Sequence, residues 1–164
     1  EPGASPVPPG PPATADDEPV GAMPGNLATG IRVGRPVYDR CYDPGSKVAL
    51  PRAACDRVLA FEQRLFQRLR IVERCRNAAV GLEINGRLNL GVDIDFTTQV
   101  LHIFNGRSST IPDVTRMTNC VRSGVLGMPI AGIPHQRGRY KIFIPIDLGT
   151  GHRPAAGSPP ALAP

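Results

Sequence analysis

The sequence predicts an α+β two-layer sandwich, in which two helices cover a three-stranded antiparallel sheet in the order helix-strand-strand-helix-strand. Three segments alternate between apolar and polar residues, as strands with one solvated face do. Two others repeat apolar residues every three or four positions, as amphipathic helices do. Since each element has one apolar side, packing the helices on the sheet buries all of them.

The foldable part is shorter than the 164-residue chain. Residues 1–38 and 149–164 are dominated by Pro, Gly and Ala, and we expect extended tails there because they hold too little apolar surface to fold alone. The domain then spans residues 39–148, a size at which disulfides add useful stability.

One stretch of the first tail is different. The segment from Gly30 to Tyr38 contains the β-branched residues Ile31, Val33 and Val37. We expect it to add a strand to an exposed sheet edge, either of this chain or of a neighbour, and so to contact a partner.

The first helix is predicted as one continuous element from Arg57 to Glu73. Its apolar stripe consists of Val58, Phe61, Leu65, Leu69 and Val72. Cys55 and Cys75 flank it, and 20 residues of helix would hold them about 30 Å apart. A disulfide needs Cα atoms within about 7 Å, so these two cysteines are not expected to pair.

Two disulfide pairings of the four cysteines remain. We favour Cys41–Cys55, a local clasp at the helix start, together with Cys75–Cys120. The alternative joins Cys41 to Cys75 and Cys55 to Cys120.

The cysteines also indicate the compartment. Their even number, without a C-x-x-C motif or a nearby histidine, favours structural disulfides and an oxidising environment over a metal site. Four free thiols in a cytosolic protein are the competing interpretation. Because the chain begins at Glu1 rather than methionine, we expect an exported protein whose signal is missing from this sequence. No apolar run is long enough to predict a membrane span.

The remaining elements follow in order. A strand covers residues 87–96, with Leu88, Leu90, Val92, Ile94 and Phe96 facing inward. A turn at Thr97 and Thr98 leads to a second strand from Gln99 to Phe104.

The second helix is expected to be capped by Ser109 or Thr110, with Pro112 and Asp113 in its first turn. Its apolar stripe is Val114, Met117, Cys120 or Val121, and Val125.

The last strand, Arg139 to Leu148, points Tyr140, Ile142, Ile144, Ile146 and Leu148 inward. Pro145 lacks a hydrogen-bond donor, so we expect the strand to have at least one unpaired flank there. A right-handed crossover from the second strand to the last leaves the first strand in the middle, antiparallel to both.

The net charge of +5 comes almost entirely from arginine. Clustered arginines are typical of nucleic-acid binding, but here they are scattered and not interleaved with aromatic residues. We therefore expect no nucleic-acid partner, whereas a protein partner with an acidic surface stays an open alternative.

Few residues suggest chemistry. Asp93 and Asp95 share a strand face, and Asp147 could lie nearby, as in a carboxylate pair or a hard-metal site. A solvated sheet face is the simpler interpretation. We expect neither an enzyme nor a bound metal or cofactor, because no phosphate loop, nucleophile elbow or zinc-binding histidine pair occurs.

Several short motifs carry a family resemblance over roughly residues 58–148. They are Val72-Glu73-Arg74-Cys75, the run from Gly86 to Ile94, Asn119-Cys120-Val121-Arg122, Gly127-Met128-Pro129, and the run from Tyr140 to Ile146. This part resembles the TonB C-terminal-like domain, in the cysteine-containing variant of bacterial envelope and gliding-motility proteins. It departs from that family at the turn Asp95–Thr98, which lacks Asp-Gly, and in the second helix, which lacks a Trp before its Pro.

The resemblance implies a Cys75–Cys120 bridge and a non-catalytic periplasmic or cell-surface domain that binds proteins by strand pairing. We expect the two later strands to supply the contacts, through Val100, His102, Arg139, Lys141 and Phe143. Two other functions stay open: the terminal domain of a TonB-like energy-transducing machine, and an envelope enzyme or peptidoglycan-binding module.

Overall fold

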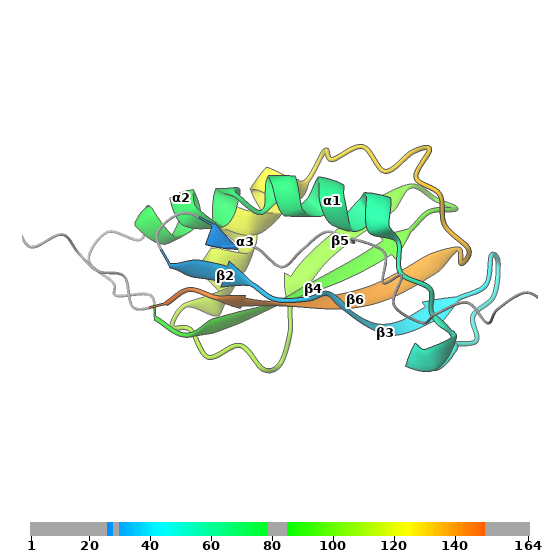
Figure 1. Ribbon diagram of the computed structural model, residues 1–164, viewed down its shortest axis with the longest axis horizontal. Coiled ribbons are helices and arrows are strands. Elements are labelled where there is room, and N and C mark those ends of the chain that lie inside the picture. The colour runs from blue at the N-terminus through cyan, green and yellow to red at the C-terminus, as the bar shows by residue number, and fades with distance from the viewer. Residues whose placement is uncertain (1–25, 28–29, 79–84, 150–164) are drawn as a thin grey trace, which may run out of the picture.

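A computed structural model describes residues 26–27, 30–78 and 85–149. Helices α1 (Leu59–Arg68), α2 (Ile71–Asn77) and α3 (Val114–Val125) lie together on one side of the sheet, and the short 3₁₀ helix η1 (Arg52–Ala54) lies at one end (Figure 1). The α+β two-layer arrangement is therefore confirmed. None of the helices in the described part of the chain combines the length and the apolar composition that a membrane span requires.

The sheet is entirely antiparallel and larger than predicted. Its strands run in the order β1 (Asn26–Leu27), β2 (Ile31–Val33), β6 (Arg139–Asp147), β4 (Arg87–Asp95) and β5 (Val100–Asn105), and β3 (Val37–Tyr42) also pairs with β6. The expected placement of β4 between β5 and β6 is confirmed. The prediction of three strands is wrong, because the sheet has six.

The additional strands come from the segment expected to be a tail. Ile31, Val33, Tyr38 and Cys41 are buried in the core, and β2 and β3 pair with β6 of the same chain. The domain boundary predicted at residue 39 is therefore too late. The expectation that this segment adds a strand is correct for this chain's own sheet. The predicted boundary falls too late because Pro and Gly in the connections interrupt the alternation of apolar and polar residues in β2 and β3.

Strand β6 is consequently an interior strand, and the expectation that Arg139–Leu148 offers an edge is wrong. On one flank Pro145 has no strand partner, as predicted, because β2 pairs with β6 only as far as Ile146 and β3 only from Phe143. The N–H of Gly34 donates to the carbonyl of Pro145 at 2.7 Å. Since N–H and C=O of one strand residue point the same way, the missing N–H of Pro145 faces this break between β2 and β3.

The core lies between the helices and one face of the sheet. All predicted inward residues of β4 and β6, together with Phe96 and Leu148, are buried, as are Phe61, Leu65, Met117, Val121 and Val125 of the helices. The alternation read from the sequence thus assigned the two faces of both long strands correctly.

The first predicted helix is not continuous. It begins at Leu59 and is interrupted at Leu69 and Arg70, where the N–H of Val72 donates to the Leu69 carbonyl, three residues back. Leu69 and Val72 are both buried, so the tighter turn keeps both sides of the break packed on the core. No Gly or Pro marks the break, so the apolar spacing alone did not reveal it.

The favoured disulfide pairing is confirmed. Cys41 bonds Cys55, with Cα atoms 5.6 Å apart, and Cys75 bonds Cys120, with Cα atoms 5.8 Å apart. The alternative pairing and the free-thiol interpretation are therefore wrong.

The cap predicted for the second helix is also wrong. The N-cap of α3 is Asp113, whose side chain accepts from the N–H of Arg116. Ser109 and Thr110 instead accept from the N–H groups of Asn89 and Arg87. These bonds tie the loop before α3 to the start of β4.

Candidate functional site

The candidate site lies on the side of the sheet that bears no helix, called here the helix-free face. Antiparallel register places outward side chains of β3, β6, β4 and β5 in three rows across it. The rows are Tyr42, Arg139, Asp95 and Val100; then Arg40, Lys141, Asp93 and His102; then Val37, Phe143, Gly91 and Phe104.

A shallow groove of about 470 Å³ crosses this face. Its lining residues are Asp93, Asp95, Thr98, Val100, His102, Phe104, Arg139 and Lys141. They come from β4, β5, β6 and the β4–β5 turn. The groove therefore combines apolar and charged side chains on a rigid sheet.

An ion pair forms one wall of the groove. Arg139 binds Asp93 in a bidentate manner, with its Nε 2.7 Å from Oδ1 and its Nη2 2.5 Å from Oδ2. The guanidinium also lies 5.3 Å from the ring centre of Tyr42. The hydrogen bonds to Asp93 raise the pKa of Arg139 above its usual value, so its charge is fixed.

Asp95 is held by the turn that follows β4. Its Oδ1 accepts from the N–H groups of Thr97 and Thr98 at 2.8 and 3.0 Å. Desolvation alone would raise the pKa of Asp95, but these hydrogen bonds outweigh it, so the pKa lies below its usual value. The carboxylate is ionised at neutral pH and is not suited to act as a proton donor.

An aromatic pair forms the apolar part of the site. Gly91 makes room for Phe104, because a Cβ at position 91 would lie 2.3 Å from the Phe104 ring. That ring meets Phe143 edge to face at 5.9 Å, and the Lys141 ammonium lies 5.1 Å from the centre of the Phe104 ring. A half-buried aromatic belt thus runs beside a cationic side chain.

The structure brings most of the predicted contact residues together. Val100, His102, Arg139 and Lys141 line the groove, Phe143 packs against Phe104, and Val37 pairs with Phe143 across the strands. Val100, which is 54% exposed, is among the most exposed large apolar residues described.

Ile31 and Val33 do not belong to this surface. Their side chains are buried in the core, so the expectation that they contact a partner is wrong. Phe104 was missed, although its position across from a strand glycine is a signal for close packing.

The three aspartates do not form one site. Asp147 pairs in register with Arg87, whereas Asp93 pairs with Lys141, six residues away along β6 and therefore about 20 Å distant. No group of three or more His, Cys, Asp or Glu able to hold a metal occurs among the described residues. The expected proximity of Asp147 to Asp93 and Asp95 is wrong.

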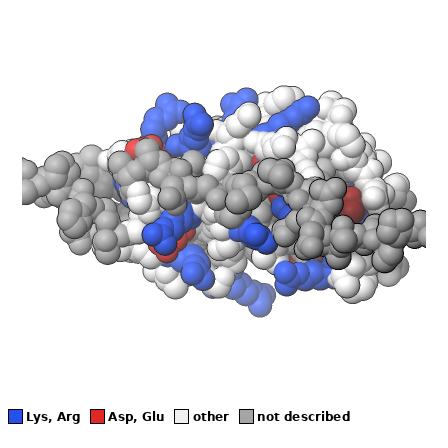
Figure 2. Space-filling view, viewed as in Figure 1, with Lys and Arg blue, Asp and Glu red and all other residues white. Residues whose placement is uncertain are grey.

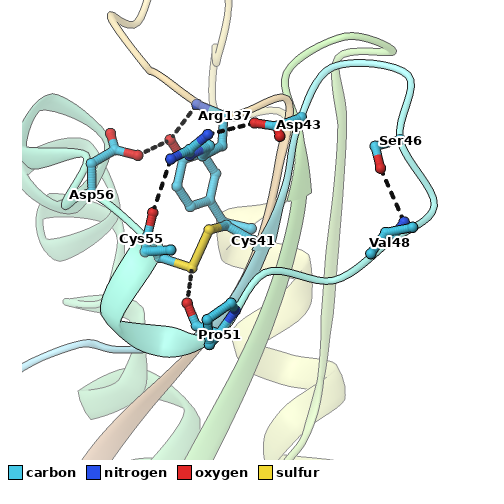
Figure 3. Close-up of polar contacts among 10 residues, drawn as sticks. Cys41, Asp43, Ser46, Val48, Pro51, Cys55, Asp56 and Arg137 are labelled. Carbon is cyan, nitrogen blue, oxygen red and sulfur yellow. Dashed lines mark hydrogen bonds and ion pairs between the residues drawn. A yellow bond between two sulfur atoms is a disulfide. The ribbon is translucent and has the colours of Figure 1, made fainter.

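A second distinctive surface is the loop closed by the first disulfide, residues 42–54, called here the clasped loop. Figure 3 shows Arg137 bridging its two arms: Nη1 donates to Asp43 at 2.5 Å and Nη2 to the Ala54 carbonyl at 3.2 Å. The Tyr140 hydroxyl donates to Asp56 at 2.7 Å. Val48, which is 72% exposed, lies on this restrained loop.

Comparisons with protein-family models, with curated proteins and with solved structures find no match to this chain. The structure itself adds one functional constraint: its two disulfides indicate folding in an oxidising, non-cytoplasmic environment.

Proposed function

We propose that this chain is a non-catalytic, exported interaction module of a bacterial cell-envelope or surface complex, which binds a protein partner through the helix-free face. The observation that carries the proposal is the groove, where Val100, His102, Arg139 and Lys141 meet beside the Phe104–Phe143 pair. Exposed apolar and aromatic side chains rimmed by charges are typical of protein-binding surfaces.

The mode of binding that we propose differs from simple strand pairing. Strand β5 is the edge of the sheet on this side, but the Nε of Arg122 in α3 donates to the Ile103 carbonyl at 3.0 Å and occupies part of that edge. Side-chain docking on the face therefore supplies the main contact, and pairing along the rest of β5 adds to it.

The periplasmic or surface location and the link to TonB-like domains rest on the sequence resemblance. They are supported by the disulfides and by the presence of the helix-strand-strand-helix-strand order within the larger fold. The ion-paired Asp93 and the ionised Asp95 favour recognition over acid–base chemistry at this face.

Site-specific photo-crosslinking in the native cell tests the proposal. A benzophenone side chain would replace Val100 or His102 on the helix-free face, or the exposed Gln67 on α1 as a matched control. We expect a discrete adduct with one protein from positions 100 and 102 and none from position 67.

The substitution Lys141→Glu should weaken that adduct without altering the abundance of the protein. Equal crosslinking from all three positions, or adducts from position 67 alone, would contradict the proposal.

A further inference from the structure

The charges of this chain are unequally distributed. The described residues hold eighteen of its nineteen basic side chains but nine of its fourteen acidic ones. Residues 1–25 hold four carboxylates, Glu1, Asp16, Asp17 and Glu18, and no lysine or arginine. A strongly cationic domain is thus joined to an anionic segment.

One group of basic residues lies along α1, along α2 and at the break between them, and Figure 2 shows further basic side chains along the lower edge of the same view. Arg64, Arg68, Arg70 and Arg74 form what is called here the arginine surface, and Figure 2 shows basic side chains along the upper edge, where these helices lie. Arg64 donates to the Pro129 carbonyl at 2.9 Å. Arg68, Arg70 and Arg74 are exposed and make no hydrogen bond or ion pair within the described part of the chain.

The spacing of these arginines favours binding of an anion. Arg64 and Arg68, like Arg70 and Arg74, are four residues apart, a spacing at which like charges on a helix repel. The helix pair has two carboxylates, Glu62 and Glu73. Glu62 is buried and already bound by Arg57 and Tyr38.

We propose that the arginine surface binds a carboxylate-rich segment, and that its occupant is this chain's own run Asp16-Asp17-Glu18. Guanidinium groups bind carboxylates in bidentate geometry, which matches the chemistry of that run. The charges of the two parts are complementary, and both belong to one molecule.

The length of the chain permits this contact. Seven residues separate Glu18 from β1, so eight Cα–Cα steps join Glu18 to Asn26, and an extended chain of that length reaches about 28 Å. Strand β1 lies at the same end of the molecule as α2 (Figure 1). A short tether gives an effective concentration on the order of millimolar, so even weak ion pairs are populated at low salt.

The test compares the full chain with the charge-neutral variant D16N/D17N/E18Q by NMR of the arginine Nε–Hε groups. We expect the signals of Arg68, Arg70 and Arg74 to differ between the two proteins at low salt, while that of the exposed Arg52 in η1 stays unchanged. Raising the salt to about 0.5 M should move the wild-type signals to the positions of the variant, because exposed ion pairs are screened.

A peptide of residues 11–25 gives a second measurement. It should bind the variant several-fold more tightly than the wild type, whose surface is already occupied. Identical arginine signals in both proteins at low salt would overturn the proposal. Wild-type signals that shift on dilution would overturn it too, because the occupant would then be a second copy.

Discussion

At the scale of single residues, the most consequential group is a buried polar network between β3 and α1. The Tyr38 hydroxyl donates to Glu62 Oε1 at 2.9 Å and accepts from the N–H of Val58 at 2.9 Å. Arg57 holds the same carboxylate through two hydrogen bonds. The network fixes the start of α1 against the sheet.

Removing the Tyr38 hydroxyl should therefore destabilise the fold. We expect Tyr38→Phe to lower the free energy of unfolding by about 1–3 kcal/mol, because a buried carboxylate and a buried N–H each lose a partner. Urea unfolding measures the change. Tyr42→Phe, in the same strand but half-exposed, is the control and should cost less than about 0.5 kcal/mol.

Two tyrosines should also make stability depend on alkaline pH. Burial raises the pKa of Tyr38 above its ordinary 10.0, and Glu62 adds to the rise. Burial likewise raises the pKa of Tyr140, with Asp56 adding to it. Above about pH 10 the unfolded chain loses protons that the folded state keeps, so the contribution of both groups is complete below that pH and falls beyond it.

Urea unfolding between about pH 8 and pH 11 tests this expectation. The free energy of unfolding of the wild type should fall at the alkaline end, and that of Tyr38→Phe should fall less steeply. An equal decline in both proteins would mean that Tyr38 does not contribute.

The packing of Phe104 over Gly91 gives a prediction for the candidate site. Gly91→Ala places a Cβ into the Phe104 ring, so we expect the ring to swing away from Phe143. The ring-current shifts of Phe143 measured by NMR should change. Adding Phe104→Leu should relieve the clash. The double variant should therefore lose less free energy of unfolding than the sum of the losses measured for the two single variants.

At the scale of elements, a side chain of α3 occupies part of the exposed edge of β5. The Arg122 side chain covers the Ile103 carbonyl, a group that a further strand would otherwise use. We expect Arg122→Ala to increase concentration-dependent self-association, measured by sedimentation. Arg116→Ala, on the same helix and exposed, removes the same charge and should leave the protein as it was.

The elements also differ in how well the sequence predicts them. The strict alternation in β4 and β6 assigned the buried face of both strands correctly, because each has one face against helices and one that is free. The sequence predicts a tail up to residue 38, although β2 and the start of β3 lie there, because Gly34 and Pro36 interrupt the alternating pattern. The break between α1 and α2 has no local signal, because it arises from packing both halves on the same core.

At the scale of the whole molecule, the two disulfides join parts that the sheet alone does not hold. Cys41–Cys55 closes the clasped loop over 14 residues, and Cys75–Cys120 ties α2 to α3 over 45 residues. We expect the loss of either bridge to cost about 3–4 kcal/mol in the chain-entropy model, with the larger loop costing about 1 kcal/mol more.

The paired variants C41S/C55S and C75S/C120S, unfolded in urea beside the wild type, measure these costs. Removing both members of a bridge avoids a leftover thiol that could form new pairs. A smaller loss for C75S/C120S than for C41S/C55S would contradict the chain-entropy ranking.

The candidate site depends on the whole molecule more than on any motif. The sequence predicts partner contacts from two edge strands, through Val100, His102, Arg139 and Lys141. The structure does place these four residues together in a groove, but the pairing of the strands, and not an exposed edge, is what brings them there. Strand β4 lies between β5 and β6, so side chains far apart in sequence share one face. Register across a sheet is a non-local property, so the sequence pattern of one strand does not predict which residues of the other strands lie beside it.

Four features followed from the sequence alone: the α+β class, the faces of the long strands, the order of the last five elements and the exclusion of a Cys55–Cys75 bridge. All of these depend on local periodicity or on the reach of a helix. Only the tertiary structure decided that Ile31 and Val33 are buried, that β6 is an interior strand, and that Phe104 covers Gly91. Each of these depends on which strands pair, and pairing is decided by burial of the whole core rather than by any one segment.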